Sequence, residues 1–441
     1  MTTQYPIRGG SASEIAGSIE AGITGARLRP GDRIATVRKL AATLRLSPTT
    51  VAAAYQNLRA RGLIFADGRR GTAISPQPPI ISRAHTEIPA DVRDLITGSP
   101  DPALLPPLAP VLSRINLRPR LYGESTSLPA LLELAAREFT ADGIPSGPIA
   151  VVSGALDGIE RVLNAHLRPG DRAAVEDPGY AALFDLLKAM GLKAVPMQLD
   201  DMGVIPAELS SALKAGAQAC VLTPRAHNPS GAAFDSRRAA ALRRILAEHP
   251  RVLAIEDDHA GPIAGRRAVT VMTADRPRWA VVRSVSKSLG PDLRLAVMIG
   301  DATTIARVEG RQSLGAGWVS HILQQVVVGL WGDPKVARLL NKAAAAYTAR
   351  REAMVEALAH HGIAARGRSG LNVWVPVPEE QAVVQSMQAA GWGVIAGERY
   401  RMKSPPAIRI TISRLGPGEA EQIAADLARG LEPERLRSHL A

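Results

Sequence analysis

The sequence predicts an α/β protein with a mostly parallel central sheet, preceded by a small helix-turn-helix head. Three observations support this prediction. Short β-rich runs alternate with helical patterns from about residue 148 onward, two short helical patterns follow one another closely near the N-terminus, and a proline-rich segment separates the two regions. A chain of 441 residues is long enough for two or three domains. We expect a DNA-binding head at residues 1–75, a linker at residues 76–93 and a large domain at residues 94–441.

Composition excludes several classes of protein. Hydrophobic residues make up 46% of the chain and charged residues 21%, which indicates a soluble globular protein rather than a disordered one. The single cysteine, Cys220, lies in an apolar run, so we interpret it as a small buried residue. No apolar run is long enough to span a membrane, and the N-terminus lacks the apolar segment of a signal peptide. We therefore expect a cytoplasmic protein with no membrane partner.

The formal net charge of +12 is unevenly distributed along the chain. Residues 1–75 contain eleven Lys or Arg and four Asp or Glu, so the net charge of this sixth of the chain is eleven minus four, or +7. The remaining residues contribute only +5. This asymmetry is typical of a polyanion-binding head on a nearly neutral body. The alternative is a basic surface that only improves solubility.

Two capped helices in close succession predict the helix-turn-helix. Thr36 can cap the first helix, and Ser47 followed by Pro48 begins the second, with a serine at the cap and a proline at the first helical position. The second helix would place these apolar residues on its inner face: Val51, Ala54, Tyr55 and Leu58. In such motifs the second helix enters the major groove of DNA. A β-hairpin is expected after it, from residues 63–65 and 72–74.

This head resembles the GntR family of winged helix-turn-helix regulators over about 65 residues, in the stretch RLRPGDRIATVRKLAATLRLSPTTVAAAYQNLRARGLIFADGRRGTAI. Together with the expected helices and hairpin, the resemblance implies these DNA contacts: Arg38, Arg45, Ser47, Pro48, Thr49, Thr50, Arg69, Arg70 and Gly71. Family members often place an arginine where this chain has Pro48. That contact is therefore either missing or moved to Arg45 or Thr49. The alternative role for Arg38 is an ion pair on the helix surface.

The large domain is predicted from apolar runs of strand length. The expected strands are Ile149–Val152, Arg172–Val175, Ala219–Leu222, Val252–Ile255, Trp279–Val282 and Leu295–Ile299. Near-continuous apolar strands separated by helical patterns indicate a parallel sheet covered on both faces. Ligands of such sheets bind beyond the carboxyl ends of the strands.

Polar groups follow these strands at the places where a ligand would bind. Tyr180 offers a stacking face or simply packs, and Asn228 offers a hydrogen bond or simply forms a turn with the proline after it. Three successive acids at residues 256–258 would repel one another unless a cation or a proton donor lies close. A pyridinium nitrogen is one such partner; a metal is another, but no paired His or Cys spacing supports it. Lys287 lies between serines, with Arg294 seven residues later, which suits a phosphate near a reactive amine.

The second region resembles the fold-type I aminotransferases that depend on pyridoxal 5′-phosphate (PLP). The motifs SGALDGIERVL, EDPGY, TPRAHNPSG, IEDDHAG and SVSKSLGPDLRLA occur in the family's order, and the resemblance covers roughly residues 94–430. It implies that Lys287 is the catalytic residue that forms the Schiff base with PLP. Asp257 would pair with the pyridine nitrogen, Asn228 would bond the ring hydroxyl and Tyr180 would stack on the ring.

The same resemblance implies further contacts. The phosphate would be surrounded by Ser153, Gly154, Ala155, Ser284, Ser286 and Arg294. Tyr122 matches a tyrosine that reaches the phosphate of a neighbouring subunit, which implies a homodimer. Arg409 matches the arginine that clamps the carboxylate of a substrate or effector. Two departures stand out: His259 replaces the usual tyrosine at the ring oxygen, with a charge expected to vary near neutral pH, and the YGES segment lacks the usual glycine-containing turn.

A GntR head joined to an aminotransferase-like body is the arrangement of MocR-type regulators. Four motifs resemble the PtsJ branch of these regulators, which is associated with vitamin B6 metabolism: TPRAHNPSG, RSVSKSLGPDLRLAV, GWVSHILQ and LNVWVPV. The resemblance implies a regulator that binds operator DNA and senses PLP or a PLP–amine adduct. One alternative is an active PLP-dependent aminotransferase with an incidental basic head. The other is a regulator that binds no cofactor, in which Lys287 is a relic.

Overall fold

The structure, a computed structural model, describes residues 5–25, 27–60, 62–66, 71–75, 89, 91–116 and 118–432. In the N-terminal head, the helices and strands are α1 (Ala12–Thr24), β1 (Arg33–Ile34), α2 (Val37–Leu44), α3 (Pro48–Ala60), β2 (Ile64–Ala66) and β3 (Thr72–Ile74). The three strands form an antiparallel sheet in the order β1-β3-β2. The predicted helix-turn-helix and hairpin are therefore present, and β1 adds a strand that the sequence did not predict.

Helix caps and a small apolar core stabilise the fold of the N-terminal head. The Thr36 hydroxyl accepts a hydrogen bond from the backbone N–H of Lys39 at 3.3 Å, which caps α2 as expected. Arg45 ends α2 in the left-handed conformation, with φ of 55°. The inner face predicted for α3 is fully buried, and the Tyr55 hydroxyl donates a hydrogen bond to the Ala35 carbonyl at 2.6 Å. This bond joins α3 to the segment that precedes α2.

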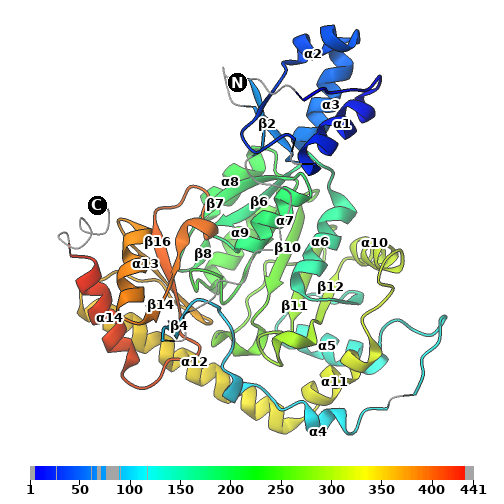
Figure 1. Cartoon of the computed structure of the whole chain (residues 1–441). Helices are drawn as coiled ribbons and strands as arrows, with labels where there is room; N and C mark the ends of the chain where they lie inside the picture. The colour runs from blue at the N-terminus through cyan, green and yellow to red at the C-terminus, as the bar shows by residue number, and fades with distance from the viewer. Residues whose placement is uncertain are drawn as a thin grey trace. The chain divides into compact units, whose positions relative to one another are not determined.

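A mixed sheet of eight strands forms the centre of the large domain, in the order β5-β12-β11-β10-β9-β6-β7-β8 (Figure 1). Its strands are β5 (Ile149–Val152), β6 (Arg172–Asp177), β7 (Lys193–Asp200), β8 (Gly203–Val204), β9 (Ala219–Leu222), β10 (Leu253–Asp258), β11 (Trp279–Ser284) and β12 (Ala296–Gly300). The neighbours β6, β9, β10 and β11 are parallel, and β12 is antiparallel to both β11 and β5. All six predicted strands are present, so the predicted fold class is confirmed.

Two strands at one edge of this sheet were not predicted. In β7, Lys193, Pro196 and Gln198 interrupt the apolar pattern, and proline is uncommon within strands. Met197 and Leu199 are nevertheless buried, because alternate residues of the strand face the core. β8 has only two residues and pairs with β7 in antiparallel fashion.

Helices cover the sheet and lead to a smaller C-terminal part. They are α4 (Ala109–Leu112), α5 (Pro129–Ala141), α6 (Ala155–His166), α7 (Ala181–Ala189), α8 (Pro206–Lys214), α9 (Ser236–Ala247), α10 (Ala302–Ser313), α11 (His321–Trp331), α12 (Pro334–His360), α13 (Glu380–Ala389) and α14 (Glu419–Gly430), with short 3-10 turns η2 (Pro102–Leu104), η3 (Gly261–Ala264), η4 (Pro291–Leu293) and η5 (Gly397–Tyr400). Among the described residues, no helix has both the length and the apolar character needed to cross a membrane.

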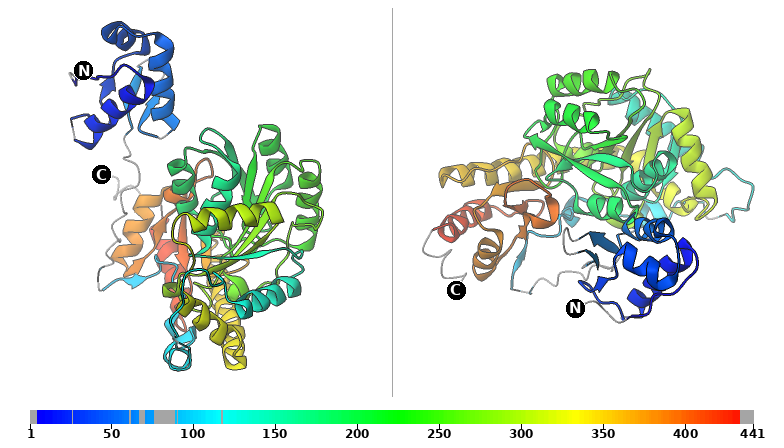
Figure 2. Two further views of the ribbon diagram at one scale, coloured as in Figure 1. Left: turned by 90° about the vertical axis from the view of Figure 1, so that its right-hand side faces the viewer. Right: turned by 90° about the horizontal axis from the view of Figure 1, so that it is seen from above.

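The C-terminal part contains a sheet in the order β13-β16-β15, formed by β13 (Asn372–Pro376), β16 (Ala407–Thr411) and β15 (Ile395–Ala396). α13 packs on this sheet and on α14 (Figure 2). A separate pair joins β4 (Arg93–Asp94) in parallel to β14 (Trp392–Gly393). The N-terminal end of the large domain is thereby fixed to its C-terminal end.

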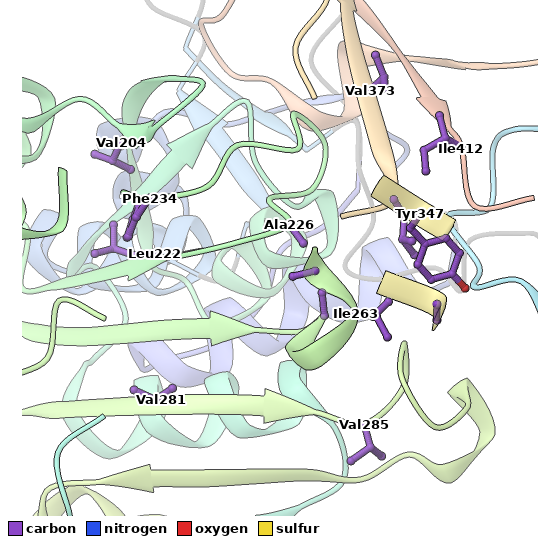
Figure 3. Packing of buried hydrophobic residues seen from close by; sticks show 14 of the residues in the cluster. Val204, Leu222, Ala226, Phe234, Ile263, Val281, Val285, Tyr347, Val373 and Ile412 are labelled. Carbon is purple, nitrogen blue, oxygen red and sulfur yellow. The ribbon is translucent and has the colours of Figure 1, made fainter. Parts of the chain in front are cut away.

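One apolar core runs through the large domain and the C-terminal part. Figure 3 shows Val204, Leu222 and Phe234 grouped in this core, with Val373 and Ile412 of the C-terminal part in the same cluster. Cys220 is fully buried in β9, as interpreted from the sequence, and burial raises the pKa of its thiol to about 12. Packing of this density fixes the strand ends on which the polar residues lie.

A buried ionic network holds the carboxyl end of β10. Asp258 accepts hydrogen bonds from Nε of Arg225 and from Nε of Arg283, both at 2.8 Å. Asp142, after α5, binds the same two guanidinium groups. The two arginines hold the pKa of Asp258 far below its usual range, because their attraction and hydrogen bonds outweigh the effect of burial. The network joins β10, β11 and the loop after β9.

We expect Asp258→Asn to lower the free energy of unfolding by about 3–5 kcal/mol, because it leaves two buried guanidinium groups with one fewer counter-charge. Urea denaturation measures the change. Glu124→Gln is the matched control, since Glu124 pairs with Arg118 at a far more exposed site and exposed ion pairs contribute little to stability. Equal effects of the two substitutions would show that burial does not govern this network.

Candidate functional site

The residues predicted to form a site do gather at the carboxyl ends of the central strands. Asp257 belongs to β10, Asn228 lies in the loop after β9, and Lys287 lies in the turn after β11. Arg409, from β16 of the C-terminal part, completes the group. Its guanidinium group lies close enough to Lys287 to lower the pKa of that amine.

Lys287 is held as an amine with an unusually low proton affinity. Its Nζ donates a hydrogen bond to the Gly98 carbonyl at 2.7 Å. Burial, and then the positive charge of Arg409, lower the pKa of Lys287 to about 8. A substantial fraction of the amine is therefore neutral slightly above pH 7, and a neutral amine is the form that attacks a carbonyl carbon.

Asp257 differs from the two acids beside it. Glu256 accepts hydrogen bonds from the Thr270 hydroxyl at 2.9 Å and from the Val271 N–H at 2.6 Å, and Asp258 belongs to the arginine network. Within the described part of the chain, Oδ1 of Asp257 is buried with no hydrogen-bond partner. Burial, followed by repulsion from Asp258 and Glu176, raises the pKa of Asp257 to about 7. Among the described residues, the cation or donor expected beside these acids is found for Asp258 and Glu256, but Oδ1 of Asp257 has none.

A buried pair that the sequence did not assign lies behind Asp257. Glu176, in β6, accepts hydrogen bonds from the Thr223 N–H at 3.0 Å and from the Thr223 hydroxyl at 2.7 Å. Nε2 of His227 lies 3.3 Å from Oε2 of Glu176, and its Nδ1 lies 2.7 Å from the Ser230 hydroxyl oxygen. Both residues belong to motifs quoted above, EDPGY and TPRAHNPSG. The signal was present, but neither motif shows which members face the interior.

Arg409 already has acceptors in this structure. Its Nη1 donates to Oδ1 of Asn228 at 3.0 Å, and its Nη2 donates to the Ile96 carbonyl. The guanidinium carbon lies 4.9 Å from the centre of the Tyr400 ring, a cation–π geometry. The Nε atom is buried without a partner in the described part of the chain, and burial lowers the pKa of Arg409.

Tyr180 and His259 both lie near charged residues of the site. Tyr180 is 40% exposed and interacts electrostatically with Asp257, Arg294 and Arg409, and burial of its hydroxyl raises its pKa. Loss of hydration, and then the charge of Lys287, lower the pKa of His259 to about 4. The expectation that the charge of His259 varies near neutral pH is therefore wrong, because the imidazole is neutral at pH 7.

The residues predicted to surround a phosphate fall into two groups. Gly154 precedes α6 with φ of 111°, a conformation that favours glycine, and a Cβ atom there would lie 3.2 Å from Nη2 of Arg294. Ser153 and Ala155 flank this glycine at the start of α6, where the N–H groups of a first helical turn favour an anion. The Ser153 N–H donates to Oδ2 of Asp157 at 3.0 Å in this structure. In the second group, the Ser284 hydroxyl accepts a hydrogen bond from the Ser286 N–H at 3.1 Å.

Tyr122 is not among the residues that this single chain gathers around Lys287. It is 93% exposed and makes an edge-to-face contact with Trp318, with ring centres 5.8 Å apart. Among the described residues, no group of three or more His, Cys, Asp or Glu side chains is placed to hold a metal ion.

The head presents most of the residues predicted to contact DNA. Arg38, Arg45, Pro48 and Thr49 are exposed. Ser47 is also exposed, and its hydroxyl accepts the Thr50 N–H at 3.1 Å, which caps α3. Thr50 and Gly71 are half-buried. Arg69 and Arg70 lie outside the described residues.

Comparison with known proteins gives two family matches. Residues 11–74 match the family of bacterial regulatory proteins named gntR, and residues 118–427 match aminotransferase class I and II. The chain is 40% identical over 428 residues to the vitamin B6 salvage pathway transcriptional repressor PtsJ of Salmonella typhimurium, which covers 96% of this chain and 99% of that protein. It is 28% identical to the HTH-type transcriptional regulator TauR of Rhodobacter capsulatus, over 93% of this chain and 94% of TauR.

Solved structures with a similar fold are aminotransferases. An archaeal alanine:glyoxylate aminotransferase has a TM-score of 0.70 at 20% identity, over 77% of this chain and 91% of its own. The kynurenine aminotransferase of Pyrococcus horikoshii, solved in complex with PMP, has a TM-score of 0.70 at 21% identity, over 80% of this chain and 92% of its own. At this identity the likeness concerns the fold.

The unpaired carboxyl group of Asp257 predicts a dependence of stability on pH. A folded pKa raised from 3.8 to about 7 means that the folded state binds the proton more tightly, so the stability from this group is present at low pH and lost as the pH rises to about 7. We expect Asp257→Asn to stabilise the cofactor-free protein at pH 8, by up to about 4 kcal/mol, and progressively less as the pH falls towards 4. Urea denaturation at several pH values measures this.

Asp258→Asn, in the adjacent residue, is the control and is expected to destabilise the same protein. A loss of stability at pH 8 in both variants would contradict the assignment of Asp257 as the unpaired acid.

Proposed function

Because the chain belongs to the GntR family of regulators whose large domain is of aminotransferase class I and II, the MocR-type arrangement, we propose that it is a PLP-responsive transcription regulator. The head at residues 1–75 binds double-stranded operator DNA, the linker spans residues 76–93, and the domain at residues 94–441 senses PLP or a PLP–amine adduct. The single observation that supports PLP best is the buried Oδ1 of Asp257, which has no hydrogen-bond partner in the described part of the chain and lies in the same site as Lys287.

The residues of the site fit PLP chemically. When bound, PLP supplies an aldehyde that reacts with an amine and a pyridine ring that accepts electrons. Asp257 would accept the pyridinium N–H, which would satisfy its oxygen and oppose the burial and repulsion that raise its pKa. Asn228 and the neutral His259 would hydrogen-bond the ring oxygen, and Tyr180 would stack on the ring. Lys287 would hold the aldehyde carbon.

The phosphate and the effector would be bound by cationic and N–H groups. The phosphate set is Ser153, Gly154, Ala155, Ser284, Ser286 and Arg294. We propose a homodimer in which Tyr122 reaches the phosphate of the partner subunit, since its ring is exposed in a single chain. Arg409 would bind an effector carboxylate, a stronger acceptor than the neutral amide and carbonyl that it contacts now.

The proposed target is vitamin B6 metabolism, because the relative of 40% identity is described as a repressor of vitamin B6 salvage. We propose that the protein acts in the cytoplasm, where DNA is accessible to it. A second candidate function, transamination, is favoured by the presence of Lys287, Asp257 and Arg409 together. Repeated turnover of an amino donor and a keto acid by the purified protein would support that candidate.

DNA binding with and without PLP tests the proposal. The probe is a DNA fragment selected from a random-sequence pool by the purified full-length protein. We expect PLP to change the Kd by about fivefold or more, the range of a coupling free energy of 1–3 kcal/mol, and to give a visible absorption band. Both effects should be lost in Lys287→Ala and kept in Lys342→Ala, an exposed lysine of α12. Identical titrations in all cases would exclude PLP as the signal.

The salt dependence of DNA binding tests the head. Each DNA phosphate that a protein neutralises contributes about 1 to the steepness of the slope of log K against log salt concentration. Loss of one such contact therefore makes the slope shallower by about 1. We therefore expect Arg38→Ala to weaken binding to all sequences and to reduce this slope. Arg237→Ala, an exposed arginine of α9, is the control and should leave the slope unchanged. An unchanged slope in Arg38→Ala would show that Arg38 does not contact a DNA phosphate.

A further inference from the structure

Residues 93–101, here called the 93–101 segment, directly follow the predicted linker and are anchored to the C-terminal part. Its first two residues form β4, which pairs with β14 (Figure 1). Leu95 is fully buried, and its carbonyl accepts the Thr411 N–H at 3.0 Å. The Ser413 hydroxyl donates to the Ser99 carbonyl at 2.6 Å. The segment is thereby held at both ends.

Asp94 shapes the middle of the 93–101 segment. Its Oδ1 accepts the Ile96 N–H at 2.8 Å and the Thr97 N–H at 3.1 Å, and its Oδ2 accepts the Thr97 hydroxyl at 2.8 Å. Gly98 then has φ of 63°, a conformation that favours glycine. This turn aims two carbonyl groups, those of Ile96 and Gly98, at the site.

Those two carbonyl groups accept hydrogen bonds from two cations of the site. Nζ of Lys287 donates to Gly98 at 2.7 Å, and Nη2 of Arg409 donates to Ile96. Hydrogen bonds from charged donors are roughly twice as strong as those between neutral groups. The residue that would hold an aldehyde and the residue that would hold a carboxylate are therefore both bound to one short stretch of backbone.

We propose that the 93–101 segment communicates the ligand state of the site to the linker. Ligands take Lys287 and Arg409 away from the Gly98 and Ile96 carbonyls. The released segment then moves, and with it the end of the linker that is joined to residue 93. This inference rests on the function proposed above and adds the residues that connect its two ends. Asp94 acts as a positioning residue, because its carboxylate hydrogen-bonds to Ile96 and Thr97 of the segment. Its charge also acts on Arg409, whereas Thr97→Val removes one of these hydrogen bonds and leaves that charge in place.

The chemistry of Lys287 explains the release. A protonated Nζ has three N–H donors. Condensation of the neutral amine with an aldehyde forms a C=N bond, and the two amine hydrogens leave with the aldehyde oxygen as water. Nζ would then carry one N–H or none in place of three, so its hydrogen bond to the Gly98 carbonyl would be weakened or lost. The raised proportion of neutral amine implied by the lowered pKa of Lys287 favours this step.

The chemistry of Arg409 adds a second release. A carboxylate accepts two parallel hydrogen bonds from one guanidinium group, whereas Ile96 offers a single neutral oxygen. An amine ligand that carries a carboxylate therefore competes with the 93–101 segment for Arg409. Because a ligand shifts an equilibrium only through different affinities for its two states, the lost carbonyl contacts are the difference that this mechanism requires.

The test uses the full-length protein with PLP and the selected DNA fragment. Three measurements are made on wild type and on Asp94→Ala: the absorption band of attached PLP, amide hydrogen exchange of the 93–101 segment, and the Kd for DNA with and without PLP. Asp333→Ala is the matched control, since Asp333 makes a similar side-chain bond to the Lys335 N–H at 2.7 Å. Thr97→Val, which removes only the hydroxyl donor to Asp94, replaces Asp94→Ala if that variant does not fold.

In wild type and in Asp333→Ala, we expect PLP to speed exchange in the 93–101 segment and to change the DNA Kd by about fivefold or more. In Asp94→Ala, PLP should still attach, but exchange should be fast without it and the change in Kd should fall below about twofold. A full change in Kd in Asp94→Ala, or unchanged exchange in wild type, would overturn this inference alone. If the Kd of the wild-type protein for DNA is the same with and without PLP, the proposed function itself would be overturned.

Discussion

The site depends on the alternation of side chains along one buried strand. Neighbouring residues of β10 face opposite sides of the sheet, so Asp257 and Asp258 enter different surroundings although they are adjacent in sequence. Asp258 meets two guanidinium groups and remains charged. Among the described residues, Oδ1 of Asp257 has no hydrogen-bond partner. The arginine network thus stabilises the strand that presents this buried acid, whose burial without a partner costs free energy.

Much of this arrangement could be predicted from the sequence. Asp257, Asn228 and Lys287 follow apolar runs of strand length, and because ligands bind at the carboxyl ends of such strands, the three residues are expected to lie together. The caps at Thr36 and Ser47 likewise marked the helices of the head. Local patterns were sufficient here because caps and strand ends involve residues close together in sequence.

Other features required long-range contacts that no local pattern contains. Arg225 and Asp142 meet across 83 positions of the chain, and Lys287 meets Gly98 across 189. The neutral state of His259 depends on burial and on the charge of Lys287, so the expectation from its sequence position alone is wrong. The strand β7 was missed because Pro196 and the polar residues of the strand concealed the alternation that buries Met197 and Leu199.

The contacts that Arg409 makes without a ligand also bear on how much ligand the protein needs. Its guanidinium group already has an amide oxygen and a backbone carbonyl as acceptors. An incoming carboxylate gains only the difference between its own bonds and those it displaces, which is an exchange and not an addition. If Arg409 binds an effector carboxylate as proposed, the site would need a higher effector concentration than one whose arginine had no acceptors to give up. It would then respond to an abundant compound and not to traces of it.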